Sequence, residues 1–274
     1  TKMRYKCPNG HILSITFGNF ANGNRCQKCS YIKISKKNRK YNINENYFEK
    51  IDTSNKAYII GFLLADGSIT RNLYTIIINL QIKDIEILNF IKTEMQSEHP
   101  IFSYKTTDKR NCKEYWSHKL SIGSKKMVKD LMNIGIYPMK TYLDIVPKIP
   151  QQFVGGFLRG YFDGDGHISS HFYYNKRKNK KFKHGKFIIS AYSTQLLQNV
   201  KKLCNIDYGY IRKGSSCYEW TIYKHSDLKQ IFHLMYDNNV FCLERKHKKF
   251  LEIIQYIDRN NESVQYLYNE LHPA

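Results

Sequence analysis

Two copies of one pattern stand 99 residues apart in this chain: Ala57-Tyr-Ile-Ile-Gly61-Phe-Leu-Leu-Ala65-Asp66-Gly67-Ser-Ile69 and Gly156-Phe-Leu-Arg-Gly160-Tyr-Phe-Asp-Gly164-Asp165-Gly166-His-Ile168. Looser matches follow each copy, and their offset drifts only as far as 106, which separates Lys140 from Lys246. Self-similarity over such a length indicates that one structural unit occurs twice.

Each copy has the pattern of a helix, two strands, a second helix, two strands and a third helix. Alternating β-branched residues predict the strands, and residues such as Asp84 predict the starts of helices. The chain is therefore expected to have an α+β fold with two pseudo-symmetric αββαββα halves. The predicted strands are 73–80, 115–122, 186–191 and 218–223, and the predicted helices between them are 85–95, 125–132 and 195–203.

Small residues recur at every fourth position of both copies: Ala57, Gly61 and Ala65, and Gly156, Gly160 and Gly164. Residues four apart share a helix face, and glycine destabilises a helix interior by about 1 kcal/mol relative to alanine. Small side chains at this spacing let two helix backbones approach closely. We therefore expect the two helices to pack along these stripes, with their terminal acids converging.

Those acids, Asp66 and Asp165, are the candidate catalytic residues. A carboxylate at a helix C-terminus lies in the negative end of the helix dipole, and two such carboxylates repel each other. The arrangement is unfavourable without cations, and hard oxygen ligands suit Mg²⁺, which can promote phosphodiester hydrolysis. The alternative is that Asp-Gly is simply a turn after a helix. The Asp-Gly pair occurs twice, each time at the same position relative to the stripe of small residues, and the chain is strongly basic. These observations favour the metal site.

The charge of the chain points to nucleic acid. Lys and Arg number 44 against 23 Asp and Glu, which gives a net charge of +21. Such a field captures polyanions. An anionic membrane surface is the weaker alternative, because the basic residues are spread along the chain. No run approaches the roughly 18 apolar residues of a membrane span. Seven cysteines without a secretory signal favour an intracellular location, in a bacterial or phage-infected cell or an organelle.

The repeated pattern resembles the LAGLIDADG homing endonucleases. The second copy, 158–166, matches the family motif closely, with Arg159 where alanine is usual. The first copy departs more, with Leu64 where an Asp often stands, but both copies keep the later Asp that binds metal in the family. Two motifs in one chain are similar to the monomeric, pseudo-symmetric form, and the resemblance covers residues 45–265.

The resemblance implies two sheets that form a saddle in the DNA major groove, and cuts across the minor groove that leave short 3′ overhangs. Two or more Mg²⁺ ions would be held by Asp66 and Asp165 with the backbone carbonyls of Ala65 and Gly164. The family's basic residue, which organises water and steadies charge, would be Lys140 in one half and Lys246 in the other. Gln81 resembles a water-ordering position.

Base reading is expected from long polar side chains that alternate outward on strands, where they can meet donors and acceptors in the major groove. The candidates are Asn79, Gln81, Tyr115, Ser117, Lys119, Tyr192 and Lys224. The basic run 176–186, with Lys176, Arg177 and Lys178, is expected to be a hairpin loop that touches phosphates; a disordered charged loop is the alternative.

Four N-terminal residues have the spacing of a structural zinc site: Cys7, His11, Cys26 and Cys29. The C-x3-H and C-x2-C pairs suit tetrahedral Zn²⁺, and so small a segment hardly folds without such a staple. The alternatives are that only the Cys26 and Cys29 pair binds, or that the cysteines are incidental. The spacing resembles zinc-ribbon-like modules of mobile-element nucleases, so the module is expected to extend contact along DNA. The remaining cysteines (Cys112, Cys204, Cys217 and Cys242) are interpreted as core residues.

The expected organisation is a zinc module at 1–32, a basic linker at 33–48, and halves at 49–148 and 149–274. The expected function is a site-specific, Mg²⁺-dependent double-strand DNA endonuclease that acts as a monomer. An intron RNA maturase or a DNA-binding regulator on the same scaffold is the alternative, with host intron RNA as the second partner. Loss of either acid would favour binding alone, and both acids are present.

Overall fold

The computed structural model describes residues 2–37, 40–107, 113–140, 143–177, 179–237 and 240–271. The chain divides into two compact units, residues 1–42 and 43–274. The predicted boundaries at 32, 48 and 148 remain predictions. Over the described ranges, no helix combines the length and apolar character that crossing a bilayer requires.

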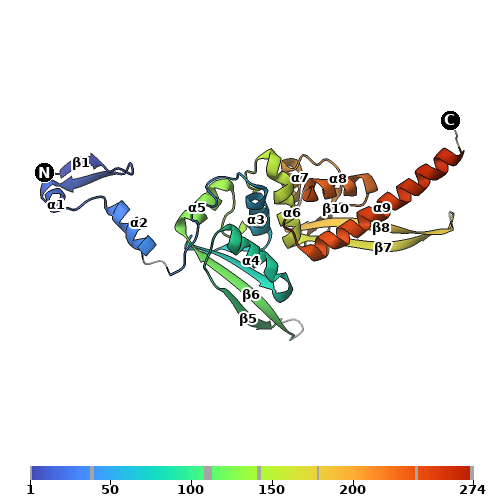
Figure 1. Ribbon diagram of the computed structural model, residues 1–274, viewed down its shortest axis with the longest axis horizontal. Helices are drawn as coiled ribbons and strands as arrows, with labels where there is room; N and C mark the ends of the chain where they lie inside the picture. Colours follow the sequence, from blue (N-terminus) through green and yellow to red (C-terminus); the bar gives the residue numbers. More distant parts are fainter. Residues whose placement is uncertain are drawn as a thin grey trace. The chain divides into compact units, whose positions relative to one another are not determined.

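The first half of the larger unit has the predicted order of elements (Figure 1). Its four strands form one antiparallel sheet in the order β3-β4-β6-β5. Ser124 caps helix α5 by accepting a hydrogen bond from the Met127 amide. The elements are α3 (Ser54–Ala65), β3 (Gly67–Ile69), β4 (Thr75–Gln81), α4 (Ile85–Glu94), β5 (Ile101–Thr107), β6 (Glu114–Gly123) and α5 (Lys125–Ile134).

The second half repeats this architecture and adds a helix. Its sheet has the order β7-β8-β10-β9, again antiparallel. The 28-residue helix α9 extends beyond the repeat and is not predicted from the sequence pattern. The elements are α6 (Val154–Asp165), β7 (Gly166–Asn175), β8 (Lys180–Ala191), α7 (Thr194–Leu203), β9 (Tyr210–Lys213), β10 (Tyr218–Ile222), α8 (His225–Tyr236) and α9 (Glu244–Leu271).

Helices α3 and α6 pack against each other at the centre of the larger unit (Figure 1). A methyl group added at Gly61 would collide with the Phe157 carbonyl, and one added at Gly160 would collide with the Tyr58 carbonyl. The obstructing atoms are backbone, so they cannot rotate away. This contact confirms the predicted packing along the small-residue stripes. A single hydrophobic core continues through both halves.

Three expectations about local structure are wrong. Residues 180–186 belong to strand β8, and the turn between β7 and β8 is shorter than the predicted loop. A run of lysines is compatible with a strand because alternate side chains reach solvent. Tyr192 and Lys224 lie just beyond the ends of β8 and β10 and not on the strands.

The interpretation of the cysteines as core residues is correct for Cys204, which is 4% exposed. Cys242 is half-buried against the core. Cys217 is half-buried in the turn before β10 and is not part of the core cluster. Cys112 lies outside the described residues.

The smaller unit contains a two-stranded antiparallel sheet and two helices. Strand β1 (Lys2–Lys6) pairs with β2 (Ile12–Thr16), and Thr16 then caps the short helix α1 (Phe17–Ala21). Helix α2 (Gln27–Lys37) continues into the segment that was expected to be a linker. The ring of Tyr5 contacts that of Phe20 with centroids 5.5 Å apart, so α1 covers one face of the ribbon.

Candidate active site and metal site

The two predicted acids lie together at the ends of the paired helices. Asp66 follows the last turn of α3, and Asp165 is the last residue of α6. A Cβ placed on Gly164 would lie 3.3 Å from the Asp66 carboxylate oxygen Oδ2. The acid of the first half therefore reaches across to the helix end of the second. Glycine at position 164 leaves the room for that approach.

The surroundings of these carboxylates disfavour their charged form. Burial, and then the charge of Asp66, raise the pKa of Asp165 to about 6, against the opposing effect of Lys140 and Lys246. Burial likewise raises the pKa of Asp66, and the same two lysines oppose that shift. Although protein atoms surround both carboxyl groups closely enough to raise their pKa, both residues remain exposed to solvent. An accessible pair of carboxylates under mutual repulsion is a site that a divalent cation would stabilise.

Lys246 lies beneath the end of α6. Its side chain comes from the first turn of α9 and the residue is only 8% exposed. The Nζ atom donates to the carbonyl oxygens of Phe162 and Asp163, each at 2.8 Å, and of Gly166 at 2.7 Å. Burial lowers the pKa of this lysine to about 8. The ammonium thus adds hydrogen bonds to the carbonyls around the C-terminus of α6, where backbone donors are scarce.

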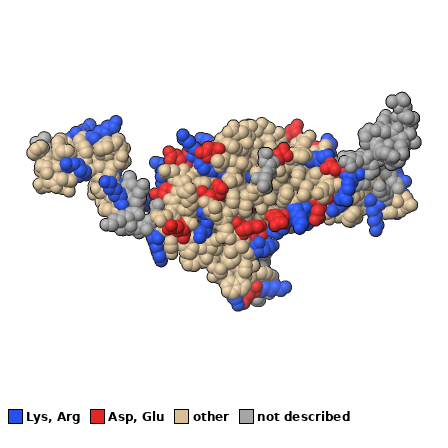
Figure 2. All heavy atoms as spheres, viewed as in Figure 1, with Lys and Arg blue, Asp and Glu red and all other residues tan. Residues whose placement is uncertain are grey.

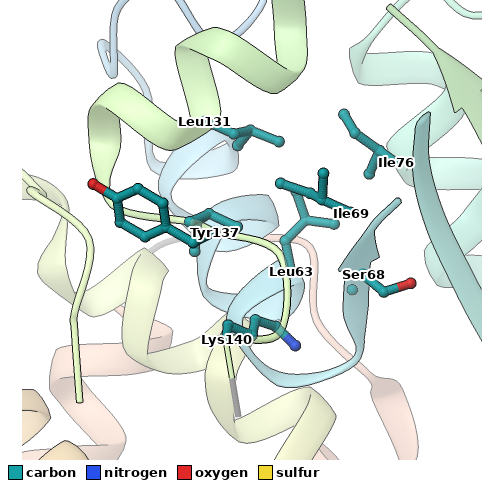
Figure 3. Close-up of a pocket in the computed structure, with 9 residues that line it drawn as sticks. Leu63, Ser68, Ile69, Ile76, Leu131, Tyr137 and Lys140 are labelled. Carbon is teal, nitrogen blue, oxygen red and sulfur yellow. The ribbon is translucent and has the colours of Figure 1, made fainter. Parts of the chain in front are cut away.

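Lys140 has the corresponding place in the first half. Its Nζ donates to the Ala65 carbonyl at 2.9 Å, and burial lowers its pKa, against the effect of Asp165 and Asp66. Figure 3 shows the side chain directed toward the turn between α3 and β3. It borders a mainly apolar pocket, lined by residues such as Leu63 and Tyr137, that is too narrow to admit water. The pocket holds the lysine and is not a substrate site.

The backbone carbonyls that were expected to bind metal are those that these lysines approach. Ala65 accepts from Lys140, and the Gly164 carbonyl lies 3.4 Å from the Lys246 Nζ. Because a carbonyl oxygen has two lone pairs, a lysine contact leaves one for a cation. The donor set of two carboxylates and two carbonyls, all oxygen, fits a hard divalent ion.

Asp163 is a site-proximal residue that sequence reasoning did not single out. Its Oδ2 accepts hydrogen bonds from the Tyr58 hydroxyl at 2.9 Å and from the Leu243 amide at 2.8 Å. It therefore joins the helix of the first half to the segment that leads into Lys246. Burial raises its pKa to about 6. The sequence does contain a signal for this residue: an Asp often stands at this position of the motif, and Asp163 keeps it where the first half has Leu64.

Arg159, the other departure from the family motif, is also structural. It is 2% exposed and donates to the backbone carbonyls of Met235 and Phe241 and, at 3.4 Å, to Ser54 Oγ. Met235 lies in the last turn of α8. The guanidinium thus holds the end of α8 and the following loop against the central helices.

The predicted base-reading residues of the first half share one face of the sheet. Asn79 pairs with Lys119, and Gln81 pairs with Ser117, on the side opposite the buried residues of β4 and β6. Tyr115 lies further along the same face and is 42% exposed. Gln81 is at the end of β4, exposed, and no described hydrogen bond connects it to either acid. These side chains form a polar surface.

The second sheet presents a comparable surface. His167, Ser169 and Lys186 occupy neighbouring outward positions on β7 and β8. An ion pair between Arg212 and Glu219, 2.7 Å long, lies on the paired strands β9 and β10. Lys176 and Arg177 are exposed in the turn between β7 and β8, and Lys178 lies outside the described residues. Tyr192, at 61%, and Lys224 are also exposed.

The four predicted zinc ligands converge in the smaller unit. Their ligand atoms all lie within 4.8 Å of one another, and no other group of three or more His, Cys, Asp or Glu residues does so in the described parts of the chain. Cys7 Sγ lies 3.7 Å from Cys29 Sγ, and His11 Nδ1 lies 3.4 Å from the Sγ atoms of Cys26 and Cys29. Tetrahedral zinc with bonds of about 2.3 Å to sulfur and 2.0 Å to nitrogen requires separations of about 3.8 and 3.5 Å. The cluster fits zinc.

Hydrogen bonds around the cluster also stabilise the thiolate form of one of the proposed ligands. Burial by itself would raise the pKa of Cys7, but hydrogen bonds from the backbone N–H groups of His11 and Asn9 and from the Cys29 and Cys26 side chains together lower it to about 7. The side-chain amide of Asn9 also donates to Cys29 Sγ at 3.3 Å. Hydrogen bonds to ligand sulfurs are typical of the surroundings of a metal site.

Comparison with known proteins finds solved structures that share this fold. No protein-family profile matches the chain. A stretch of 114 residues is 30% identical to the DNA-directed RNA polymerase subunit Rpo1C of Methanocaldococcus jannaschii, and it covers 41% of this chain and 12% of that relative's length. The chain is similar in structure to the LAGLIDADG meganuclease I-CpaMI bound to uncleaved DNA, with a TM-score of 0.55 and 14% identity over 78% of this chain and 95% of the other.

Two further structures show the same likeness. The LAGLIDADG meganuclease I-AabMI bound to uncleaved DNA gives a TM-score of 0.52 with 13% identity over 74% of this chain and 91% of its own. I-SmaMI bound to uncleaved DNA in the presence of calcium gives 0.52 with 15% identity over 75% and 92%. At such low identity the likeness establishes the fold.

Proposed function

We propose that this chain, which has the LAGLIDADG meganuclease fold, is a site-specific endonuclease that hydrolyses both strands of duplex DNA. The observation that carries the proposal is the convergence of Asp66 and Asp165 at the ends of two glycine-packed helices, with Lys140 and Lys246 beside them. A purely structural role does not account for two acids that are placed where they repel each other.

The roles of the residues follow from their chemistry. Asp66 and Asp165, with the carbonyls of Ala65 and Gly164, would hold Mg²⁺ ions. Bound Mg²⁺ would supply charge stabilisation at the scissile phosphate. Lys140 and Lys246 keep the helix ends in place and add positive charge where a phosphate must approach. Gln81 is proposed to orient water.

The outer faces of the two sheets are the proposed DNA surface. Their side chains are long, polar and basic, which suits reading of the major groove and contact with phosphates. One chain supplies both halves, so it is proposed to act as a monomer and to cut each strand once. The cuts are proposed to cross the minor groove and leave short 3′ overhangs. The polar face of the first sheet, with Asn79, Lys119 and Ser117 in register, supports this assignment.

The test is selection of cut sites from duplex DNA of random sequence. The protein would be incubated with the library and Mg²⁺, Ca²⁺ or a chelator, and the new ends would be sequenced. We expect staggered cuts at one long, degenerate site with Mg²⁺ and none with the chelator. Selective binding without cuts would favour the DNA-binding regulator, and selective binding of intron RNA without cuts would favour the maturase.

Substitution of Lys246 by Met is expected to slow the cutting of one strand more than the other. The variant removes the charge beneath the end of α6 and the hydrogen bonds that Lys246 donates to the Phe162, Asp163 and Gly166 carbonyls. We expect the affected strand to be cut about 10²-fold more slowly, and the unfolding free energy to fall by about 1–3 kcal/mol. A duplex labelled on each strand in turn measures the two rates.

Lys140→Met is expected to slow the opposite strand, and Lys248→Met, at an exposed position nearby, is the control. Equal slowing of both strands by Lys246→Met, together with a normal fold, would refute the assignment of one lysine to each half.

We also propose that Cys7, His11, Cys26 and Cys29 bind one structural Zn²⁺. Cys26→Ser is expected to reduce bound zinc from about one per chain to near zero, and to unfold residues 1–42 while the larger unit stays folded, because so small a unit buries little apolar surface. Elemental analysis measures zinc, and amide hydrogen exchange measures the folding of each unit. Cys217→Ser, outside the cluster, should change neither. Full protection of the N-terminal amides in a zinc-free Cys26→Ser protein would contradict a structural role.

A further inference from the structure

The charge of the chain is concentrated in its smaller unit. Ten of the 44 Lys and Arg residues, and none of the 23 Asp and Glu residues, lie in residues 1–42, so the net charge is +10 there and +11 over the other 232 residues. In Figure 2 the visible surface of this unit carries Lys and Arg and no acid. No carboxylate of the unit can therefore neutralise these cations.

One face of the β1–β2 ribbon gathers three of these charges. Lys2, Arg4 and Lys6 are exposed and alternate with half-buried residues along β1, so all three point to the same side. Their partners across the ribbon are Thr16, Ser14 and Ile12. Cations at alternate positions of one strand are about 6.7 Å apart and repel one another. An anionic partner along the ribbon would relieve that repulsion.

The other face of the ribbon is occupied by the unit's own core. Tyr5 packs on Phe20 of helix α1, and Arg25 lies 4.2 Å from the centre of the Phe20 ring while it donates to the Phe20 and Asn24 carbonyls. Arg25 is thereby committed to the structure of the unit. Lys2, Arg4 and Lys6 have no such role in the fold.

We propose that this ribbon face, defined by Lys2, Arg4 and Lys6 on β1 and Ser14 on β2, is a second DNA-binding surface that grips duplex DNA through its phosphates. A two-stranded ribbon fits the major groove of B-DNA, whereas the major groove of an RNA duplex is too narrow for side chains to read. Single strands are usually held by aromatic stacking, and the side chains of this face include no aromatic ring. The inference extends the proposed DNA binding and is independent of cleavage.

The test measures how salt weakens binding of the full-length protein to duplex DNA of random sequence that contains no cleavage site. Each phosphate contact contributes about −0.9 to the slope of log Kobs against log salt concentration. The triple variant Lys2→Gln, Arg4→Gln, Lys6→Gln is expected to reduce the magnitude of that slope by about 2.7 between about 50 and 200 mM salt. Zinc content should stay at the wild-type value.

The matched control is Lys28→Gln with Lys33→Gln, which removes two exposed charges of the same unit from helix α2. An unchanged slope in the triple variant, or an equal loss per charge in the control, would overturn the assignment of the ribbon face. Tighter binding of structured RNA than of duplex DNA by the wild type, with this preference lost in the triple variant, would overturn the choice of partner. Cleavage at the selected site on a short duplex tests the endonuclease separately, so either proposal can fail alone.

Discussion

In the Asp165→Asn protein, double-strand cutting is expected to fall by at least about 10³-fold while DNA binding is retained. Asparagine keeps the size of the side chain but removes the negative charge that would hold a divalent cation at the end of α6. The substitution also removes the repulsion from Asp66 that raises the Asp165 pKa. The metal-free fold should therefore be at least as stable as the wild type. Asp66→Asn is expected to have the same effect on cutting.

Three measurements separate the effect on chemistry from an effect on folding. Gel-based cleavage of the selected site gives the rate, fluorescence anisotropy gives DNA affinity with a chelator present, and urea unfolding gives stability. Asp207→Asn, which changes an exposed acid away from the helix ends, is the control and should cut normally. Normal cutting of both strands by either the Asp66 or the Asp165 variant would show that these acids are not the catalytic pair.

The second large effect is expected from Gly160→Val. The added side chain would be driven into the Tyr58 carbonyl and the Phe62 amide of the partner helix. Neither backbone group can move without opening the contact between α3 and α6, which lies within the continuous core of both halves. We expect the unfolding free energy to fall by more than about 4 kcal/mol, measured by urea unfolding of the purified protein.

Gly160→Ala adds only a methyl group, so the loss of unfolding free energy can still be measured if the valine variant does not fold. Ala is the better helix former, so any destabilisation by this variant reports the contact and not helix propensity. Gly18→Ala is the control, because a Cβ at this helical position has nothing within 4 Å. If Gly160→Ala proved as stable as the wild type, the helices would not be held at the distance described.

The parts of the site that depend on local spacing could be predicted from the sequence. Helical phase places Gly61 and Gly160 on facing stripes, and the same phase carries Asp66 and Asp165 to the helix ends. The Cys and His cluster could be predicted in the same way, because two short pairs of candidate ligands, which begin at Cys7 and Cys26, lie close together in the sequence. Strand alternation correctly placed Asn79 and Ser117 on one face.

Predictions failed where distant segments compete for one side chain. Asp84 stands at the N-cap position of α4, as expected, but makes no capping hydrogen bond. Its carboxylate instead accepts two hydrogen bonds from Arg245, at 3.0 and 2.9 Å, from a residue 161 positions away. Both carboxylate oxygens of Asp84 are therefore engaged by a residue that is distant in the sequence, which the local capping pattern could not indicate.

The order of elements and the pairing of the two helices follow from periodicity and spacing, because those patterns act over a few residues of one helix or strand. The same patterns single out Asp66 and Asp165 and the four proposed zinc ligands. The contacts within the site join segments that are 75 to 105 residues apart in the sequence. They are the hydrogen bonds from Lys140 and Lys246 to backbone carbonyls, and those that Asp163 accepts from Tyr58 and from the Leu243 amide. Such contacts form only once burial makes an unpartnered charge or carbonyl costly. They are therefore decided by the packed core and cannot be recognised in the linear chain.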